Sequence, residues 1–406
     1  MKINYFSPLP PAKSGIAEVA ALIIPALSQD ADVTVWTDQK EWDRNLESYA
    51  KIHQYNENEV SWYDINKSDL NVYHVGNNVQ HHRGILALSQ RVPGLVVLHD
   101  IELNDLFHGF YSVQGGDTKN VTARKTITMS TTEWAIDNAM AVMVHNQGAF
   151  YELAKHQRWL LSYQPLPYVG LPLFSTNQVK LPPPYRLVLF GHIGYNRRVE
   201  SVLKALDEMP DKNKFLLDIY GGIDDEHTLR QEISQRNLKS IVRVHGFVLD
   251  EVLDRALSKA HLAINLRYPT MGEASLSQLR IWRHALPSMV TQVGWYEEQS
   301  EDAVLFVRQE HEIEDIKRHL QRLIDDPGSL VAMGKYGREI LEENHSPDAY
   351  AKALIELAKE LPIGYQALTA QYLVRRVERE IAPWQIPGLG NQELSRIAKA
   401  MHFLTQ

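Results

Sequence analysis

The stretch RLVLFGHIGYNRRVESVLKAL, residues 186–206, contains a complete strand, loop and helix. Its apolar run at 186–190 predicts a buried strand, and the helical spacing of apolar residues over 198–208 predicts a helix that covers this strand. Gly191 and Gly194 stand in the loop between the two elements. Uninterrupted apolar strands that alternate with helices are typical of a parallel sheet covered on both faces. The stretch therefore indicates a doubly wound α/β fold.

The same alternation extends through both halves of the chain, and three consecutive prolines at 182–184 separate the halves. Such a proline run favours an extended connector between domains. We therefore expect two Rossmann-like domains, at 1–180 and 181–346. The strands expected in the first are 2–6, 32–36, 70–75, 94–99 and 141–145, and those in the second are 186–190, 215–221, 241–246, 261–266, 288–292 and 303–307.

A helical C-terminal extension is expected at 347–406, with helices at 348–360, 364–382 and 391–404. Apolar residues recur at helical spacing in the last of them, which predicts packing on a neighbouring domain. Docking to a partner or to a membrane is the alternative. The basic tract at 372–380 has two interpretations of its own, because its charges suit either a solvated helix face or contact with anionic lipid.

The composition excludes several classes of function. The 406 residues include no cysteine, which rules out disulfides, thiolate catalysis and cysteine-ligated zinc. A net charge of −8 argues against bulk electrostatic capture of nucleic acid. Glu18 and Pro25 interrupt the apolar N-terminal run, and no window reaches the length of a membrane span. We expect a cytoplasmic protein, with association at the inner face of the cell membrane left open.

Ligands of open α/β sheets bind beyond the carboxyl ends of the strands, so the loops after the strands carry the candidate residues. Dinucleotide and P-loop chemistry are disfavoured, because the sequence lacks G-x-G-x-x-G, and GSLVAMGKY at 328–336 lacks the Ser or Thr that binds Mg²⁺. Arg197 and Arg198 follow the strand at 186–190 and stand where a helix begins. Cations are disfavoured at that end of a helix unless an anion sits there. Two solvated arginines are the alternative interpretation.

The loop NLRYPTMGEASLSQLRIW, residues 265–282, offers a second anion site. A helix that starts near Ala274 would direct the N–H groups of Ala274, Ser275 and Leu276 at a ligand. Arg267 suits a bidentate contact to phosphate, and it equally suits a structural ion pair with Glu273. The hydroxyl groups of Thr270, Ser275 and Ser277 add donors.

Histidines after the strands of the first domain form a third group of candidates. His99 and Asp100 follow the strand at 94–99, where either a functional or a structural histidine is possible. The adjacent pair His81 and His82 lacks the spacing and the carboxylate of a metal site. The acidic run at 224–227 opens a predicted helix, where aspartate favours capping over metal binding.

Several segments that lie far apart in the chain resemble, in order, motifs of the retaining glycosyltransferases of family 4. These segments are YFSPLPPAKSGIAE, YHVGNNVQHHRGI, PGLVVLHDIEL, LVLFGHIGYNRRVESVLKAL, VRVHGFVLDEVLDRALSKAHLAINLRYPTMGEAS and VGWYEE. The resemblance covers about the first 345 residues. It implies the GT-B architecture, in which two Rossmann-like domains face one another across a cleft, here with the helical extension added.

The resemblance also implies roles for individual residues. His99 matches the family histidine near the transferring sugar, Arg198 aligns with the lysine that binds the diphosphate, and Glu273 matches the first glutamate of the E-x7-E motif. These three are the expected catalytic residues. His192 stands where the family's second cation follows Gly191. The expected donor-binding residues are Gly15, Gly191, His192, Arg197, Arg198, Arg267, Thr270, Gly272, Glu273, Ala274, Ser275 and Leu276, and the expected acceptor-binding residues are Ser14, Gly15, Asn77, His99 and Asp100.

The expected activity is transfer of a hexose-type sugar, with retention, from a GDP- or UDP-sugar to a glycan or polyprenyl-linked saccharide in polysaccharide or glycoconjugate synthesis. No metal or other cofactor is expected, because arginines and helix dipoles would stabilise the leaving diphosphate. The expected partners are a sugar nucleotide and a saccharide acceptor, with no nucleic acid and with oligomerisation left open.

One departure from the family affects nucleotide recognition. Ile281 stands at the second glutamate of E-x7-E, which binds the ribose in the family, and a shifted register would place Arg280 there. Two alternatives therefore remain. One is a catalytically inactive GT-B scaffold that binds a sugar nucleotide or glycan, and the other is a GT-B epimerase or phosphorylase relative.

Overall fold

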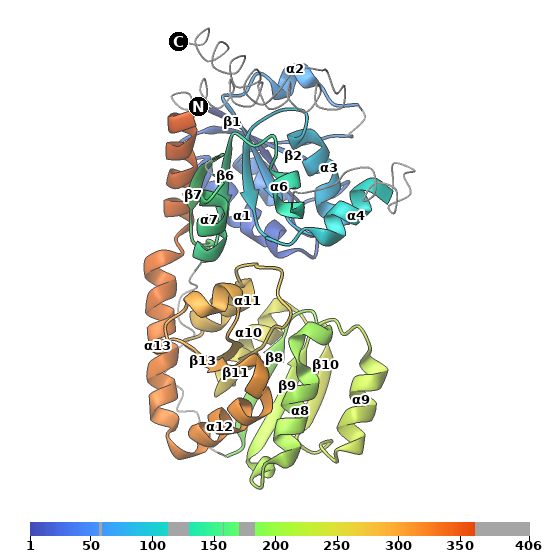
Figure 1. Ribbon diagram of the computed structural model, residues 1–406, viewed down its shortest axis with the longest axis vertical. Coiled ribbons are helices and arrows are strands. Elements are labelled where there is room, and N and C mark those ends of the chain that lie inside the picture. Colours follow the sequence, from blue (N-terminus) through green and yellow to red (C-terminus); the bar gives the residue numbers. More distant parts are fainter. Residues whose placement is uncertain (57–58, 113–129, 157, 170–182, 362–406) are drawn as a thin grey trace, which may run out of the picture. The chain divides into compact units, whose positions relative to one another are not determined.

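The computed structural model describes residues 1–56, 59–112, 130–156, 158–169 and 183–361 (Figure 1). They form two compact units. The first comprises Met1–Pro167 and the segment that begins at Pro347, and the second comprises Tyr168–Ser346. Each unit contains one parallel sheet.

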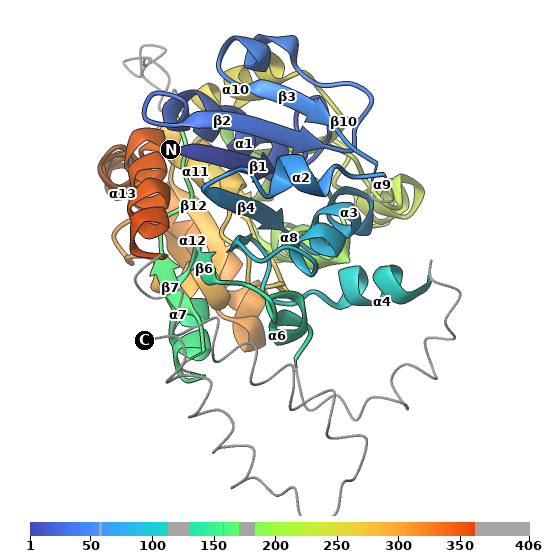
Figure 2. The same ribbon diagram turned by 90° about the horizontal axis from the view of Figure 1, so that it is seen from above.

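The first unit contains a seven-stranded sheet in the order β3-β2-β1-β4-β5-β6-β7, and Figure 2 shows β1 between β2 and β4. All of its strand pairs are parallel. Six of these strands follow the doubly wound order 3-2-1-4-5-6 of dinucleotide-binding folds. The strands are β1 (Lys2–Phe6), β2 (Asp32–Thr37), β3 (Lys51–Gln54), β4 (Leu70–Val75), β5 (Leu95–Leu98), β6 (Ala141–Val144) and β7 (Leu160–Tyr163).

Helices connect these strands. The helices are α1 (Gly15–Leu27), α2 (Trp62–Ile65), α3 (Val79–Ser89), α4 (Asn104–Ser112), α6 (Thr131–Ala135) and α7 (Gln147–Ala154), with a 3-10 turn, η1, at Arg44–Ser48. A further helix is described over 347–361. It buries Tyr350 and Leu354 almost completely, and the Tyr350 ring lies 5.8 Å from that of His145 at the end of β6. The chain therefore returns to the first unit after it completes the second.

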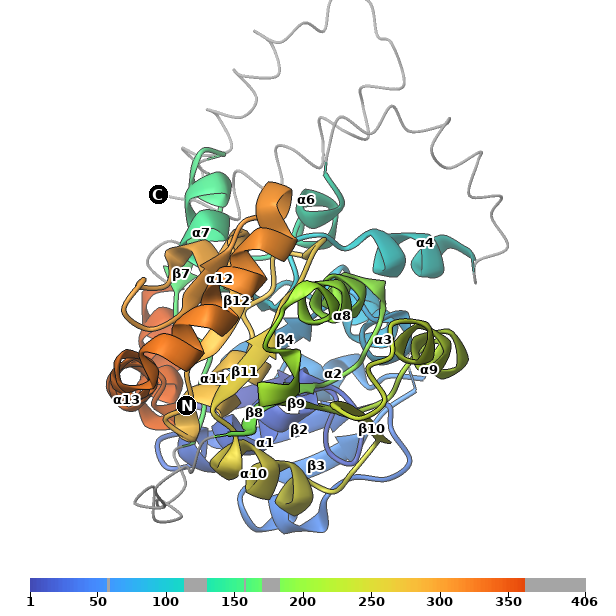
Figure 3. The same ribbon diagram turned by 90° about the horizontal axis from the view of Figure 1, so that it is seen from below.

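The second unit contains a six-stranded sheet in the order β10-β9-β8-β11-β12-β13, again the order 3-2-1-4-5-6 (Figure 3). Its strands are β8 (Tyr185–Phe190), β9 (Phe215–Tyr220), β10 (Val242–Gly246), β11 (Leu262–Asn265), β12 (Ser288–Thr291) and β13 (Leu305–Val307). Its helices are α8 (Val199–Glu208), α9 (Glu226–Gln235), α10 (Asp250–Lys259), α11 (Leu276–Arg283), α12 (Glu312–Asp325) and α13 (Pro327–Asn344). The 3-10 turns are η2 (Tyr195–Arg197), η3 (Lys212–Lys214), η4 (Gly294–Glu298) and η5 (Gln309–His311).

Alternate residues of β8 enter two separate cores, because successive side chains of a strand point to opposite faces. Leu187 and Leu189 pack with apolar residues of α8, α9, α12 and α13. Val188 and Phe190 pack with residues of α10 and α11. Figure 3 shows α8 and α12 on one side of this sheet and α10 on the other. The two parallel, helix-covered sheets confirm the fold class predicted from the sequence.

Several details differ from the sequence prediction. Strands β3 and β7 were not predicted. The expected boundary at 180/181 lies outside the described residues. The two units divide between Pro167 and Tyr168, and the Tyr168 N–H donates to the His345 carbonyl of the second unit at 2.8 Å. The expected helices at 364–382 and 391–404 lie outside the described residues. No helix in the described part of the chain is both long and apolar enough to cross a bilayer.

Candidate functional site

The loops after β8, β9 and β11 contact one another at the carboxyl edge of the second sheet. The Tyr268 N–H donates to the Asn196 carbonyl at 2.8 Å, which joins the loop after β11 to η2. Gly191 and Gly221 both adopt positive φ angles, of 109° and 125°. A Cβ atom on Gly221 would lie 1.8 Å from the Gly191 carbonyl oxygen, so only glycine allows this approach.

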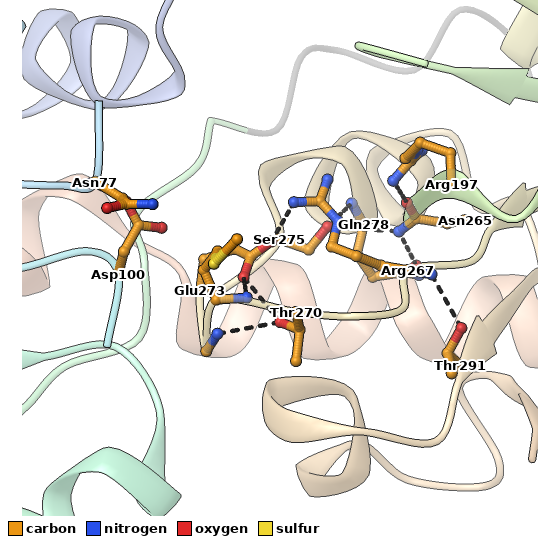
Figure 4. Close-up of polar contacts among 12 residues, drawn as sticks. Asn77, Asp100, Arg197, Asn265, Arg267, Thr270, Glu273, Ser275, Gln278 and Thr291 are labelled. Atoms are coloured by element: carbon orange, nitrogen blue, oxygen red, sulfur yellow. Dashed lines mark hydrogen bonds and ion pairs between the residues drawn. The ribbon is translucent and has the colours of Figure 1, made fainter. Parts of the chain in front are cut away.

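Arg197, at the end of η2, is buried in this edge and is only 2% exposed. Its Nη1 donates to Asn265 Oδ1 at 3.1 Å (Figure 4). Its Nη2 donates to the Phe190 carbonyl at 2.7 Å. Both acceptors are neutral, and Nε has no hydrogen-bond partner among the described residues. Burial lowers the pKa of Arg197 to about 10, Arg267 acts in the same direction, and Tyr296 and Glu273 oppose them. The guanidinium therefore remains charged at neutral pH without a directly bonded carboxylate.

Arg198 has the opposite environment. It adopts the left-handed conformation, with φ of 55°, and precedes α8. Its Nε and Nη2 donate to the two oxygens of Glu312, at 3.0 and 2.9 Å, and Ser201 also donates to this carboxylate. The bonds to Glu312 raise the pKa of Arg198. The sequence allowed either a bound anion or solvation for this arginine, and the structure pairs it with a carboxylate that is 7% exposed.

The loop between β11 and α11 is organised around Glu273. Arg267 forms an ion pair with its Oε1, while the Thr270 hydroxyl and the Met271 N–H donate to its Oε2 at 2.8 Å each (Figure 4). Burial favours a raised pKa for Glu273, but Arg267 and these donors outweigh it and lower the pKa. Gly272, with φ of 75°, makes the turn. The structural pairing of Arg267 with Glu273 is therefore present.

Helix α11 begins at Leu276, two residues later than predicted from Ala274, because Ser275 is its N-cap. The Ser275 hydroxyl accepts the Gln278 N–H at 3.2 Å and is directed inward, so the side chain is only 4% exposed. The N–H groups of Leu276 and Ser277 are consequently the first-turn donors, which have no acceptor inside a helix. The positive end of this helix dipole lies beside the loop of Glu273.

A buried network of polar side chains anchors helix α11 to the sheet. Asn265 accepts from Arg197 and donates to Gln278 at 3.0 Å, and Gln278 donates to Ser288 at 2.7 Å. All four residues are under 5% exposed. The network connects β11, α11 and β12 to the buried guanidinium, so it fixes the orientation of that charge.

The remaining predicted donor-side residues differ in exposure. His192 is exposed and lies 2.8 Å from Asp224. Ile281 is fully buried in the core beneath β8, and Arg280 pairs with Asp250 and Asp254 of α10. Ile281 and Arg280, the two residues that could stand at the second glutamate of E-x7-E, therefore provide no carboxylate there. The predicted capping role of the acidic run is confirmed, because the side chain of Asp225 accepts from the Thr228 N–H at the start of α9.

The predicted residues of the first unit lie at the carboxyl edge of its sheet. The side chain of Ser14 caps α1, whose first residue is Gly15. The Asn77 N–H donates to Asp100 Oδ2 at 2.6 Å, and its side-chain amide donates to Asp105 at 2.9 Å and accepts from the Asp105 N–H at 2.9 Å. These bonds connect the loops after β4 and β5 to the start of α4.

His99 belongs to a buried group of histidines at the same edge, with His74 of β4, His82 of α3 and His145 after β6. The distance from His99 Nε2 to His74 Nδ1 is 2.9 Å, and the His99 ring lies 4.8 Å from that of His145. Burial lowers the pKa of His74 and of His99 well below the usual 6.5, and it lowers those of His82 and His145 to about 4. All four imidazoles are therefore neutral at pH 7.

Sequence reasoning missed the partners of the predicted residues. Asn265 accepts from Arg197, Glu312 accepts from Arg198, and Gln278 in turn accepts from Asn265. His74 is the partner of His99. Asn265 and His74 interrupt apolar strands, which is a usable signal, because buried polar groups require partners. Glu312 lies 114 positions from Arg198, and no local pattern connects them. Within the described ranges, no three or more His, Asp or Glu side chains are arranged so that they could hold a metal ion.

Residues 175–340 match the family model described as "Glycosyl transferases group 1". No curated protein matches the sequence. The match lies within the part of the chain that contains the second sheet, and it supports a glycosyl transferases group 1 domain there.

Solved structures share the fold over most of the chain. A sucrose-phosphate synthase from Thermosynechococcus elongatus has a TM-score of 0.66 at 16% identity, covering 90% of this chain and 100% of that one. HepE from Anabaena in complex with UDP has a TM-score of 0.64 at 14% identity, covering 89% and 100%. WaaG, a glycosyltransferase involved in lipopolysaccharide biosynthesis, has a TM-score of 0.59 at 12% identity, covering 87% and 99%. At these identities the similarity shows the GT-B fold alone, and with the family model it supports a glycosyltransferase.

Proposed function

We propose that the chain is a retaining glycosyltransferase that moves a hexose-type sugar from a UDP- or GDP-sugar to a glycan or polyprenyl-linked saccharide. The nucleotide diphosphate would bind at the carboxyl edge of the second sheet, and the acceptor would bind in the first unit near Ser14, Asn77, His99 and Asp100. UDP is the first nucleotide to test, because structures of HepE, which has the same fold, contain UDP or UDP-glucose.

The observation that carries this proposal is the environment of Arg197. Of the three arginines in these loops, Arg198 is paired with Glu312 and Arg267 with Glu273, whereas Arg197 bonds only to neutral acceptors. A buried charge is costly unless something compensates for it. An anion beyond the loops would provide that compensation, which favours a diphosphate over a neutral sugar as the ligand at this edge.

The groups around Gly191 fit such an anion. A Cβ atom at Gly191 would lie 3.9 Å from both Arg197 Nη2 and Ser277 Oγ, so the bare backbone opens toward a cation and a hydroxyl donor. Ser277 lies in the first turn of α11, where the N–H groups of Leu276 and Ser277 are further donors. Backbone donors at a helix start, a nearby guanidinium and a glycine that allows close approach together suit phosphate oxygens.

In the proposed chemistry, negative charge grows on the leaving diphosphate while the anomeric carbon becomes oxocarbenium-like. Donors that are fixed in advance stabilise this developing charge more than they stabilise the ground state. Glu273 would contact the sugar from a loop that three hydrogen-bonding groups already hold. Retention follows in this scheme if the leaving phosphate oxygen takes the acceptor proton on the same face, and the scheme assigns no step to a metal.

Hydrolysis of sugar nucleotides without an acceptor tests the proposal. We expect slow release of UDP or GDP from the cognate donor, and we expect release to persist in excess EDTA. Glu273→Gln should lower the turnover by about 100-fold, since one well-placed transition-state group contributes about 3 kcal/mol. Arg230→Gln, which removes an exposed pair on α9, is the matched control and should be unaffected.

The alternatives give different results in the same assay. Binding of a sugar nucleotide without turnover would identify a scaffold, and conversion of the sugar without release of nucleotide would identify an epimerase relative. Loss of turnover on chelation would contradict the metal-independent scheme.

A further inference from the structure

The hydrogen bond between His74 and His99 can form with the proton on either nitrogen, and the groups around the two rings determine which arrangement is favoured. The contact joins His74 Nδ1 to His99 Nε2 at 2.9 Å, and both rings are buried. Neutral imidazole carries one proton, so one nitrogen of the pair donates and the other accepts. Either His74 donates and the His99 proton sits on Nδ1, or His99 donates and its Nδ1 is bare.

The two flanking histidines show which tautomers this edge favours. His82 Nδ1 faces the His74 carbonyl at 3.0 Å, and His145 Nδ1 faces the Gln164 carbonyl at 3.0 Å. A carbonyl only accepts, so both neutral rings carry their proton on Nδ1. These two bonds fix the rings of His82 and His145, and neither of them donates a proton to the pair of His74 and His99.

The far nitrogen of His74 decides between the two arrangements. His74 Nε2 is buried and has no hydrogen-bond partner in the described part of the chain. If His99 donated, the His74 proton would sit on this nitrogen as an unpaired buried N–H. Orphaned buried N–H groups are rarer than unpaired acceptors, so the arrangement in which His74 donates is favoured.

We propose that His74 is a positioning residue that donates from Nδ1 to His99 Nε2 and thereby fixes His99 as the Nδ1–H tautomer. The inference rests on the role of His99 in the proposed function. It assigns His99 as a hydrogen-bond donor toward the substrate and excludes it as the general base, because its only basic nitrogen is already occupied by His74.

The proton positions can be read directly, without activity. The full chain with ¹⁵N-labelled histidine should show His99 protonated on Nδ1 at pH 7.5 in long-range ¹H–¹⁵N spectra, with the signals assigned by His99→Asn. His74→Asn keeps an N–H donor near the Nδ1 position and should preserve this tautomer. His74→Phe keeps a ring without the donor, and His99 should then become a mixture of both tautomers. His145→Phe, which removes another ring neighbour, should leave the tautomer unchanged.

A wild-type His99 that carries its proton on Nε2 would overturn the proposal, whether or not the His74→Phe variant folds. A His74→Phe variant that folds and keeps the Nδ1–H form would overturn it too. In transfer assays kcat should fall about fivefold to tenfold in His74→Phe and recover in His74→Asn, the size expected for one neutral hydrogen bond. An Nδ1–H tautomer in a chain without transferase activity would instead refute the proposed function and leave the tautomer assignment standing.

Discussion

Mild acid should destabilise the first unit through its buried histidines. The pKa values of His82 and His145 fall from 6.5 to about 4 on folding, because burial disfavours the charged ring. The unfolded chain therefore binds protons at a higher pH than the folded chain. Their stabilising contribution is complete above pH 6.5 and is lost as the pH falls through the window from 6.5 to 4.

The magnitude follows from these values. At pH 5 each histidine lowers the free energy of unfolding by about 2 kcal/mol, and the pair lowers it by about 4 kcal/mol. Domains are stable by only about 5–15 kcal/mol, so the loss is a large fraction of the total. The lowered pKa values of His74 and His99 act in the same direction.

The second unit should lose stability only at a lower pH. The pKa values of Asp254 and Asp315 are lowered to about 2 from 3.8, so their contributions are lost only as the pH falls below about 4. His319, whose pKa burial also lowers, is the exception in this unit. Acid should therefore open the two units in sequence, the first unit before the second.

Hydrogen exchange at pH 7.5, 6 and 5, read by mass spectrometry on peptides from each unit and corrected for intrinsic rates, measures this directly. His145→Gln should reduce the loss in the first unit by about 2 kcal/mol at pH 5, whereas His227→Gln, at an exposed position of the second unit, should not change it. Equal losses of stability in both units, or an unchanged stability of the first unit at pH 5, would show that the buried histidines do not control the acid response.

Two further changes test the second unit. Glu312→Gln leaves the Arg198 guanidinium without its buried carboxylate and should lower the free energy of unfolding by about 3 kcal/mol in urea titrations; an unchanged midpoint would show that the pair contributes nothing. Gly221→Ala places a methyl group 1.8 Å from the Gly191 carbonyl and should lower the melting temperature far more than Gly246→Ala, which meets no atom within 4 Å and should cost only about 1 kcal/mol. Similar effects of the two glycine substitutions would contradict the close approach.

The doubly wound fold could be predicted from the sequence because its signals are local. An uninterrupted apolar run followed by a helical pattern identifies a buried parallel strand, as in β8 and α8. Strand β3 has the sequence KIHQ, in which no residue is fully buried, so its pairing depends on β2 rather than on its own pattern. Strand β7 is only partly buried along its whole length, so its own pattern does not identify it either.

The position of the candidate site could be predicted from the sequence, but the hydrogen-bond partners of its arginines could not. The sequence placed Arg197 and Arg198 together after β8, and nothing in their spacing distinguishes the buried guanidinium from the paired one. That difference arises from η2, which turns Arg197 toward Asn265, and from the left-handed conformation of Arg198. The start of α11 was two residues off because Ser275, a good capping residue, ends the loop.

In the proposed function, the buried charge of Arg197, which has no directly bonded carboxylate, helps to hold a diphosphate at the carboxyl edge of the second sheet. Calorimetric titration of UDP in EDTA, with wild type, Arg197→Lys and Arg197→Met, tests it most directly. At an effective dielectric constant of about 20, two unit charges about 7 Å apart interact by about 2 kcal/mol. We expect the Kd for UDP to rise at least about 30-fold in Arg197→Met and to be largely preserved in Arg197→Lys. Equal UDP affinity in all three folded proteins would contradict it.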